Sequence, residues 1–600
     1  MASSPASAAA DPPAGGGHAW QALAHPLAAP TLLAVALVAV PVFGGSFFAY
    51  QIALFLIYGL ATQGVALCWG RLGFLPLGQA VFFGLGAYLA GAALKAGAGQ
   101  PPALLALLPA VLLPAGLAWV LARLVFARSL RSGPYFSLIT LALTMLGFLV
   151  AQQWQSVTGG FNGMVDIPEP PGLDRYETLY GLVAATAVAS TAALGWLLRQ
   201  PLGVLWAAVA QNEERLQFLG YATDRIKALA YALSALLAAL AGALFAAHQG
   251  IVTPQAMGFV LSTEFVIWAA VGGKASPLGA LLGAVLIGYS SAELRDHFAY
   301  WEVIVALVFI AVVRFLPDGL AGLMTRARAG TPAAAGTAPE RPAPARPAAA
   351  DAPALRFDDV ACSQSGVQIL DGLSLALSGP GIRAVIGPNG AGKTSAFNAL
   401  TGRLPVQRGR IQVGAQDVTG HAAWRVARLG VGRKLQIPSV FGELTVAENL
   451  ALALWAGRLH GVRWCSNAPH HWHSALGDEL LARFPELAAQ RHRAAGQLSQ
   501  GQRQALELAL TLLPEPRLLL LDEPCAGLSP GETHRMVEAI QAGVARLGAA
   551  ALLIEHDLAA VAALEGEVFV LHQGRLLAQG PLPVLQADPA VRAVYAGARK

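Results

Sequence analysis

Long apolar stretches fill the first half of the sequence and restrict the folds open to it. A helix needs about 20 predominantly apolar residues to cross the ~30 Å hydrocarbon core of a bilayer. Ten stretches approach that length: 28–43, 47–68, 73–96, 102–126, 134–152, 178–198, 227–247, 260–273, 277–293 and 299–316. Because the stretch 260–273 is short, the pattern predicts an all-α polytopic membrane domain of eight to ten transmembrane helices over residues 27–325.

The charged residues separate this half of the chain from the rest. Residues 1–330 hold 13 acidic and 15 basic residues, whereas the shorter remainder holds 22 and 25. Hydrophobic residues make up 55% of the chain and its mean hydropathy is +0.53, which is too high for an ordinary soluble protein. The net charge of +5 is shared by both halves. Nucleic-acid binding usually needs a concentrated basic face, so no nucleic-acid partner is indicated.

The placement of basic residues predicts the orientation of the chain in a membrane. A cytoplasmic N-terminus followed by ten crossings leaves only Lys95, Arg175 and Arg295 in outside loops. The inside loops then hold Arg71, Arg123, Arg128, Arg131, Arg199, Arg215, Arg225, Lys227, Lys274, Arg314, Arg326 and Arg328. This asymmetry follows the positive-inside rule. It predicts that both termini and the whole second half of the chain lie in the cytoplasm.

Two segments contain little that could form a core. Residues 1–26 are rich in Ala, Pro and Gly and lack Lys and Arg, so we expect a flexible cytoplasmic tail rather than a cleaved signal peptide. Residues 326–354 are rich in Ala and Pro, which is typical of a tether between domains. Residues 355–600 alternate short β-rich runs with helical stretches, the pattern of a parallel α/β domain.

A glycine-rich loop stands between a strand and a helix of this second domain. The strand-like GIRAVIG (381–387) runs into GPNGAGKT (387–394), and TSAFNAL then reads as a helix. Glycines in this pattern let backbone N–H groups close around phosphate oxygens, the Lys reaches the β- and γ-phosphates, and the Thr ligates Mg²⁺. The predicted ATP-binding residues are Gly387, Pro388, Asn389, Gly390, Ala391, Gly392, Lys393, Thr394 and Ser395.

Two apolar strands end in residues suited to phosphate chemistry. RLLLLDEP (517–524) is a strand buried on both faces, with Asp522 placed to hold Mg²⁺ and Glu523 placed to act as general base toward water. AALLIEH (550–556) is a second such strand and ends at His556. The motifs together predict a P-loop NTPase of α/β fold that also contains a helical subdomain.

Further motifs make residues 355–600 resemble the ATP-binding-cassette family. LSQGQ (498–502) precedes a helix, and Gln436 lies in GRKLQIPSVF. The resemblance implies that a signature segment, Leu498, Ser499, Gln500, Gly501 and Gln502, meets the ATP held by a partner cassette. It also implies that Gln436 senses Mg²⁺ and the membrane domain and that His556 is a switch residue, so that Glu523, His556 and Gln436 form the catalytic set. Two departures are Gln500, where the family signature has Gly, and Gln364, where cassettes usually stack adenine on an aromatic side chain.

The membrane half resembles the permeases of branched-chain amino acid importers and of their urea or short-chain amide relatives. The segments that carry the resemblance are 72–88, 133–143, 158–168, 212–221, 231–246 and 271–284. It implies that residues 205–222 form the helix that docks on the cassette, with Asn212, Glu213 and Gly220 in its core and Ala210 in place of the usual Arg. Glu264, an acidic residue inside an apolar stretch, is either a pathway residue or a structural one.

The resemblance implies an importer subunit that couples ATP hydrolysis to uptake of branched-chain amino acids or of urea and short-chain amides. GRKLQIPSVF and the C-terminal VLHQGRLLAQG favour the urea-type cassette. ATP and Mg²⁺ would be its cofactors, and a bacterial inner membrane its site. Its partners would be the lipid bilayer, a periplasmic substrate-binding protein, and a second permease and cassette or a second copy of this chain. An exporter half-transporter, an ATP-gated membrane regulator and a degenerate ATPase remain open alternatives.

Overall fold

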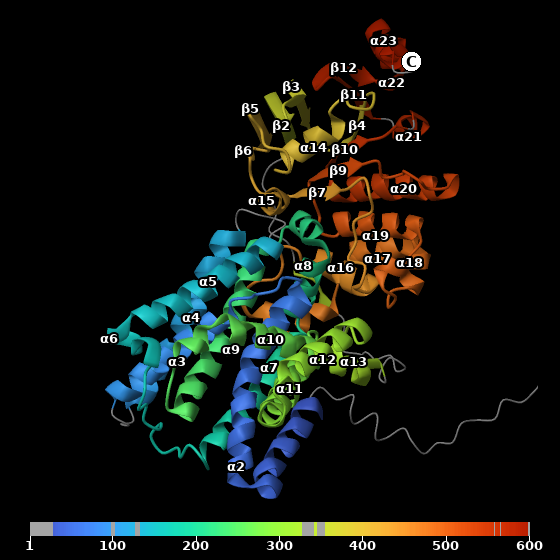
Figure 1. Ribbon diagram of the computed structural model, residues 1–600. Helices are drawn as coiled ribbons and strands as arrows, with labels where there is room; N and C mark the ends of the chain where they lie inside the picture. The colour runs from blue at the N-terminus through green and yellow to red at the C-terminus, as the bar shows by residue number, and fades with distance from the viewer. Residues whose placement is uncertain are drawn as a thin grey trace, which may run out of the picture. The chain divides into compact units, whose positions relative to one another are not determined.

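The computed structural model describes residues 28–97, 102–126, 133–326, 341–344, 354–556, 558–564 and 566–597 (Figure 1). These residues pack into two compact units. The first, the membrane unit, contains the described residues up to Leu198 and those from Lys227 to 326. The second, the cassette unit, contains Arg199–Ile226 and the described residues from 341 onward. The predicted tail, 1–26, lies outside the described residues, as does the predicted linker apart from 326, 341–344 and 354.

The membrane unit is made of apolar helices, as the sequence predicts. Its elements are α2 (Ala28–Ala66), η1 (Leu67–Arg71), α3 (Gln79–Ala96), α4 (Pro102–Phe126), α5 (Gly133–Gln153), α6 (Gln155–Thr158), η2 (Gly160–Asn162), α7 (Leu179–Leu197), α9 (Thr223–Gln249), η3 (Pro254–Met257), α10 (Phe259–Gly272), α11 (Pro277–His297), α12 (Trp301–Phe315) and α13 (Gly319–Arg326). Within the described residues, eight helical stretches are long and apolar enough to cross a membrane. The chain is therefore a multi-pass membrane protein.

The ten predicted stretches all fall on helices, but two of them share one element. The run Ala28–Arg71 is 44 residues long, more than one crossing needs. It is broken at Gly45, whose φ of 76° lies in the left-handed region that glycine favours. The first two predicted stretches lie on either side of this break. The predicted short stretch is α10, a helix of 14 residues.

Close backbone contacts and buried polar side chains join the helices of the membrane unit. A Cβ atom on Gly242 of α9 would collide with the backbone carbonyl of Phe83 on α3, so only glycine lets these helices approach so closely. Gln63 of α2 donates to the Thr191 hydroxyl of α7 at 2.8 Å, and the Ser190 hydroxyl donates to Gln63 at 2.8 Å. Small residues and interhelical hydrogen bonds of this kind are what hold helices together in lipid.

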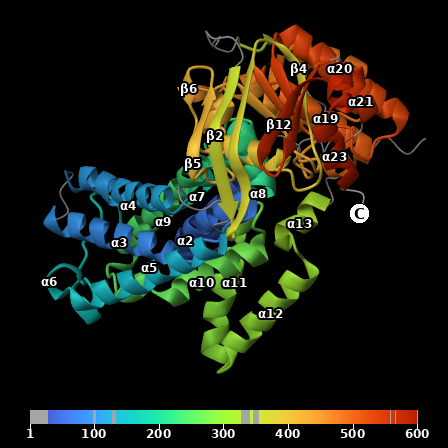
Figure 2. The ribbon, with the colours of Figure 1, turned by 90° about the horizontal axis from the view of Figure 1, so that it is seen from above.

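The cassette unit contains a six-stranded sheet, a four-stranded sheet and a two-stranded parallel sheet of β1 and β8. Its strands are β1 (Arg341–Pro342), β2 (Ala354–Gln364), β3 (Val367–Ser378), β4 (Gly381–Ile386), β5 (Arg408–Val413), β6 (Gln416–Asp417), β7 (Val431–Lys434), β8 (Trp472–His473), β9 (Leu518–Asp522), β10 (Ala550–Ile554), β11 (Glu567–His572) and β12 (Arg575–Pro581). The larger sheet has the order β12-β11-β4-β10-β9-β7, in which only β12 pairs antiparallel. The smaller sheet, β3-β2-β5-β6, is antiparallel (Figure 2).

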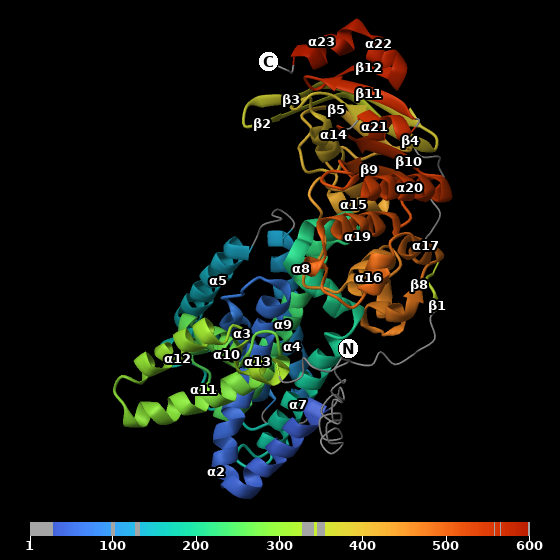
Figure 3. The ribbon, with the colours of Figure 1, turned by 90° about the vertical axis from the view of Figure 1, so that its right-hand side faces the viewer.

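The helices of the cassette unit are short, except for three. They are α8 (Pro201–Phe218), α14 (Lys393–Leu400), α15 (Ala423–Arg428), α16 (Val446–Trp455), η4 (Gly461–Cys465), η5 (Ala468–His471), α17 (Ala475–Arg483), α18 (Pro485–Ala489), η6 (Ala495–Gln497), α19 (Gln500–Leu512), α20 (Pro530–Leu547), α21 (Leu558–Ala563), α22 (Leu582–Ala587) and α23 (Pro589–Gly597). Elements α16–α19 gather into a helical subdomain beside α8 (Figure 3). This confirms the predicted α/β domain with a helical subdomain.

The core of the cassette unit explains why its central strands form where the sequence predicts them. All five residues of β9 and all five of β10 are buried, as expected for parallel strands covered on both faces. The core contains Phe357 and Leu375 of the smaller sheet together with Leu520 and Leu552 of the larger one, so it lies between the two sheets. The polar residues that follow β4, β7, β9 and β10 are thereby left at one edge.

Candidate functional site

Four neighbouring parallel strands bring the predicted nucleotide-site residues to one edge of the larger sheet. The strands lie in the order β4-β10-β9-β7. The glycine loop follows β4, His556 follows β10, Asp522 ends β9, and Gln436 follows β7. Ligands of open α/β sheets bind at the carboxyl ends of the strands. The sheet order therefore assembles the site from segments up to 169 residues apart in the sequence, from Gly387 to His556.

The glycine loop has the backbone of an anion cradle. Gly390 and Gly392 adopt φ values of 81° and 98°, and a Cβ at Gly390 would meet nothing within 4 Å. A Cβ at Gly387 would instead meet the Leu571 carbonyl. The Lys393 ammonium donates to the carbonyls of Gly387 at 2.8 Å and Pro388 at 3.1 Å. The loop residues thus lie together, as predicted.

The charge of Lys393 is balanced from across the loop. Burial lowers its pKa, and the carboxylates of Glu523 and Asp522 act in the opposite direction. Of the other predicted loop residues, Ala391 is buried, Asn389 is exposed, and Pro388, Thr394 and Ser395 are half-buried. A buried cation beside an open cradle of backbone N–H groups suits a phosphate chain.

Asp522 and Thr394 fit a hard divalent cation such as Mg²⁺. The Thr394 hydroxyl donates to Asp522 Oδ1 at 3.4 Å, whereas Asp522 Oδ2 is buried and accepts no hydrogen bond. Burial raises the pKa of Asp522, and Arg433 opposes this effect. An oxygen-rich pair with one unsatisfied carboxylate oxygen is what Mg²⁺ uses in phosphate-binding sites. The amide of Gln436, also predicted to sense Mg²⁺, contacts Glu523, and its role toward Mg²⁺ stays a prediction.

Glu523 is held from both sides by the other two predicted catalytic residues. His556 Nε2 lies 2.9 Å from Glu523 Oε1, and Gln436 Nε2 donates to Glu523 Oε2 at 3.1 Å. The Glu523 backbone has a φ of 45°, and its N–H donates to the Ile554 carbonyl at 2.9 Å. The side chain is 17% exposed. Such a carboxylate is fixed in direction yet reachable by water, as a general base requires.

The signature residues lie at the start of α19. The Ser499 hydroxyl accepts from the Gln502 N–H at 3.3 Å, and the Gln502 side chain accepts from the Ser499 N–H at 3.0 Å, forming a capping box. Leu498 is buried, and the Gln500 amide lies beside Gly527. Within the part of the chain that the structure describes, none of Leu498 to Gln502 hydrogen-bonds to the glycine loop.

The predicted docking segment is α8, and it packs within the cassette unit. Asn212 interrupts the helix with a φ of −155°, and its amide donates to the Ser439 hydroxyl at 2.8 Å. The Gly220 carbonyl accepts from Arg428 Nε at 2.9 Å. The Glu213 carboxylate accepts from the Thr223 hydroxyl at 2.8 Å, which joins it to the turn that follows α8.

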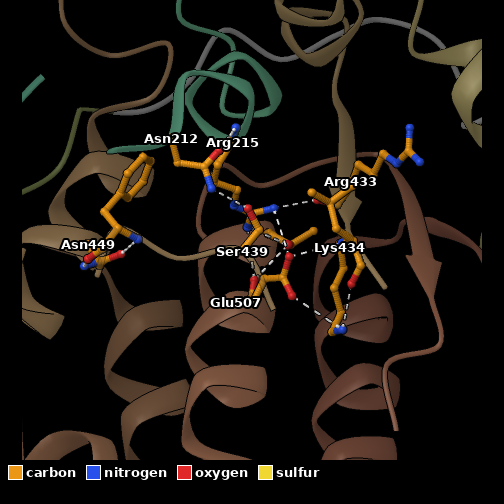
Figure 4. A network of polar contacts seen from close by, with 10 residues as sticks. Asn212, Arg215, Arg433, Lys434, Ser439, Asn449 and Glu507 are labelled. Carbon is orange, nitrogen blue, oxygen red and sulfur yellow. Dashed lines mark hydrogen bonds and ion pairs between the residues drawn. The ribbon is translucent and has the colours of Figure 1, made fainter. Parts of the chain in front are cut away.

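Several docking contacts come from residues that the sequence did not single out. Gln211 accepts from the Glu443 N–H at 2.8 Å, and the Tyr221 hydroxyl donates to the Leu452 carbonyl at 2.8 Å. Arg215, predicted only as an inside-loop cation, is fully buried against α19 (Figure 4). Its N–H donates to Asn212 Oδ1 at 2.9 Å, so Asn212 caps the second part of the helix and Arg215 lies in the first turn of that part. No local sequence pattern marks Arg215 as buried.

For two other predicted residues, the contacts in the described part of the chain do not assign a role. Glu264 is half-buried on α10, so its role as a pathway or a structural residue remains a prediction. Gln364 is exposed at the end of β2, paired with Val367 in the turn to β3. It therefore offers no aromatic face to an adenine.

Comparison with known proteins gives a family match for each half of the chain. Residues 47–313 match the family model for the permease component of branched-chain amino acid transport systems, and residues 370–526 match the ABC transporter model. The high-affinity branched-chain amino acid transport ATP-binding protein BraF of Pseudomonas aeruginosa is 32% identical over 259 residues. LivG of Escherichia coli K12, with the same description, is 33% identical over 251 residues. Each alignment covers 41% of this chain and 98% of the relative.

A more distant relative and a solved structure are similar to the same part of the chain. The probable branched-chain amino acid transport ATP-binding protein LivG of Archaeoglobus fulgidus is 30% identical, and the alignment covers 39% of this chain and 91% of the relative. A nucleotide-free ATP-binding cassette of an ABC transporter is 25% identical, with a TM-score of 0.35 over 40% of this chain and 98% of that one. A score this low adds nothing to the fold assignment.

Proposed function

We propose that this chain, which belongs to the ATP-binding cassette transporter family and joins a permease to an ATPase, is a fusion subunit of an importer for branched-chain amino acids. Urea and short-chain amides are the alternative substrates that its sequence resemblance leaves open. The observation that carries the proposal is the position of α8. This segment belongs to the permease by sequence, yet it packs among cassette elements through Asn212, Arg215 and Gly220.

The nucleotide site supports ATP hydrolysis by its own side chains. The glycine loop and Lys393 would hold the phosphates, and Asp522 with Thr394 would hold Mg²⁺. When bound, Mg²⁺ offsets the negative charge of the phosphate oxygens. Glu523 would accept a proton from water, while Gln436 and His556 keep its carboxylate directed into the site.

The signature residues support a two-cassette site. Within the described residues none of them hydrogen-bonds to the glycine loop of the same chain, and we infer that a second cassette supplies the signature for this ATP. A second permease and cassette, or a second copy of this chain, would meet the need, and a periplasmic substrate-binding protein would deliver the solute. The membrane unit would lie in a bacterial inner membrane, with α8, the cassette and both termini in the cytoplasm, as the distribution of basic residues predicts.

Helix lengths favour import over export. Apart from the broken run Ala28–Arg71, the candidate spans are 18 to 27 residues long. A helix of this length crosses a bilayer, with little left to extend beyond it. Exporter membrane domains typically have long cytoplasmic helix extensions, which these spans do not provide.

Vesicle transport tests the proposal. Membrane vesicles would be prepared from cells that express the full chain with its partner subunits, and the substrate-binding protein would be added on the periplasmic side. Right-side-out vesicles would be loaded with ATP or a non-hydrolysable analogue, whereas inside-out vesicles, whose cassettes face the medium, would receive the nucleotide outside. They would then receive radiolabelled leucine, valine, urea or acetamide. ATP-dependent leucine or valine uptake by right-side-out vesicles, abolished by Glu523→Gln, is the expected result. Uptake of urea or acetamide alone would change the substrate, accumulation in inside-out vesicles would indicate export, and flux that persists without hydrolysis would indicate a gated channel.

A further inference from the structure

Three buried charged side chains meet where α8 packs on the cassette. We call Arg215, Lys434 and Glu507 the buried triad. Their side chains are 1%, 0% and 0% exposed. Charged groups are almost never buried this fully unless they are paired, because removing each ion from water costs several kcal/mol. The nucleotide site does not explain why these three charged side chains are buried.

The Arg215 guanidinium is bound almost entirely by cassette groups. It donates to the Arg433 carbonyl at 2.7 Å, to the Thr511 hydroxyl at 3.1 Å and to the Glu507 carbonyl at 3.2 Å. It also lies 3.6 Å from the Glu507 carboxylate. Arg433 belongs to β7 of the larger sheet, whereas Glu507 and Thr511 belong to α19 of the helical subdomain. One side chain of α8 thus bridges both parts of the cassette.

The Glu507 carboxylate lies between Arg215 and the strand that leads to Gln436 (Figure 4). Its Oε2 is 3.5 Å from the Lys434 ammonium, and its Oε1 accepts from the Leu435 N–H at 3.1 Å. Leu435 directly precedes Gln436, which contacts Glu523. The helix that carries Glu507 begins at the Ser499 cap. A single carboxylate therefore meets the docking helix, the Gln436 segment and the signature helix.

The charges show why Arg215 needs these particular partners. Burial lowers the pKa of Arg215 and of Lys434, and Glu507 opposes both effects. Without Arg215, Lys434 and Glu507 form a neutral pair. Arg215 adds a further positive charge, and the carbonyl and hydroxyl oxygens around its guanidinium help to offset it. Its fork of N–H donors suits three acceptors in different directions, which a Lys ammonium on a flexible stem does not.

We propose that Glu507 is a positioning residue that transmits the state of the nucleotide site to the docking helix through Arg215. The inference rests on the proposed function, since it assigns a route for the coupling. If the helical subdomain rotates against the larger sheet, Arg215 cannot keep its contacts with both Arg433 and Thr511. Whichever of these two contacts is lost, α8 moves with the part of the cassette to which Arg215 stays bound. Glu507 determines which contact persists, because it belongs to α19 and is also bound to Lys434 and Leu435.

A cross-linking experiment on the full chain in lipid nanodiscs tests this role. Asn212→Cys and Ser439→Cys, whose native side chains are 2.8 Å apart, would be introduced after replacement of the four native cysteines. The rate of disulfide formation is compared between nucleotide-free protein and protein trapped with ATP and vanadate. Couplings through such networks change equilibria by roughly two- to thirtyfold. With the unmodified triad, we expect the rate of disulfide formation to differ by this factor between the two nucleotide states. With Glu507→Gln, we expect the two rates to differ by less than twofold.

Glu479→Gln is the matched control. Glu479 is also shared by two cations, at 3.6 Å from Arg483 and 3.0 Å from Arg546, but its side chain is 35% exposed. It should keep the full nucleotide response. The variant Arg215→Lys should lose most of it while retaining the charge.

A triple variant separates coupling from folding, because Glu507→Gln leaves two buried cations and can fail to fold. Arg215→Met, Lys434→Met and Glu507→Leu together replace the triad by apolar groups of similar volume, which often preserves or raises stability. We expect this variant to fold, to bind ATP and to lose the nucleotide response of the cross-link. A retained response in the triple variant or in Glu507→Gln would overturn the proposal, as would its absence in the unmodified triad while ATP is hydrolysed. Failure of the unmodified chain to hydrolyse ATP would instead refute the proposed function.

Discussion

Replacing Glu523 by Gln removes the negative charge of the candidate base while keeping its size. The wild-type carboxylate accepts from Gln436 and lies beside His556. An amide has one oxygen, so it can keep both contacts only if its oxygen accepts from Gln436 and its NH₂ group donates to His556 Nε2. The substitution therefore separates proton transfer from shape, which a change to Ala would not.

The expected loss of stability is small. Both Glu and Gln carry the same strain at a φ of 45°, so only a single hydrogen bond, about 1 kcal/mol, is affected. In a domain of this size that amounts to a thermal midpoint shift of about 2–4 °C. The loss of rate is much larger, because a general base contributes about 10²- to 10⁴-fold, or about 2.7–5.4 kcal/mol of transition-state stabilisation.

Two measurements on the full chain in nanodiscs check this prediction. One is the rate of phosphate release at saturating ATP and Mg²⁺, and the other is direct binding of ATP. Glu538→Gln is the control, because Glu538 also faces a histidine, with its Oε1 3.1 Å from His534 Nε2, on an exposed helix surface. We expect full activity in the control and, in Glu523→Gln, retained binding with at least a hundredfold slower turnover. Turnover above a tenth of the wild-type rate would refute the assignment of Glu523 as the base.

Three further predictions concern other parts of the chain. Burial raises the pKa of Asp522, so this group favours the folded state at acid pH and loses that contribution as the pH rises through its folded pKa. Asp522→Asn should therefore raise the thermal midpoint of the nucleotide-free chain at neutral pH, and the difference from wild type should close toward about pH 4. The same substitution should remove the stabilisation by ATP and Mg²⁺. Gln364→Tyr should lower the KM for ATP about 5- to 150-fold if the base lies over this position, since stacking contributes about 1–3 kcal/mol; an unchanged KM would place the base elsewhere. Gly242→Leu should destabilise the membrane unit by about 1–3 kcal/mol, measured as a lowered unfolding temperature in detergent, whereas Gly195→Leu, which meets open space, should not.

The membrane helices were predictable because their signal is local. Each needs only a run of apolar residues, and all ten predicted stretches are helical. What the runs could not indicate is how neighbouring ones join. Gly45 breaks the first helical run without ending it, since a single left-handed residue redirects the chain at little cost when that residue is glycine.

The nucleotide site was predictable for a different reason. Parallel strands end at one edge, so motifs that follow separate strands must converge, and Glu523, Gln436 and His556 do so. The sequence did not indicate the detailed partners. The Gln436 amide contacts Glu523 because its position depends on where β7 lies in the sheet order, which no local pattern encodes. Its role toward Mg²⁺ stays a prediction.

The buried triad was beyond sequence reasoning because its members are far apart in the chain and share no motif. Arg215 and Glu507 are 292 residues apart, and Glu507 sits in a helix whose periodicity predicts only an amphipathic packing face. An isolated Glu on such a helix is most simply read as exposed. Its burial is explained by Lys434 of β7 and by Arg215 of α8, and the proximity of these residues is a property of the assembled unit.

The use of ions at this contact argues that α8 is selected for correct placement rather than for strong binding. Apolar side chains of the same volume would hold two surfaces together at least as well. An apolar contact, however, tolerates a sliding or rotated helix, whereas the Arg215 guanidinium loses hydrogen bonds as soon as its direction changes. The Lys434–Glu507 pair is already neutral without Arg215, so the cassette can fold before α8 arrives and then admit only a helix that presents a guanidinium at this point. Such a contact costs little when α8 is in place and much when it is displaced, which is what a mechanical link between an ATPase and a permease requires.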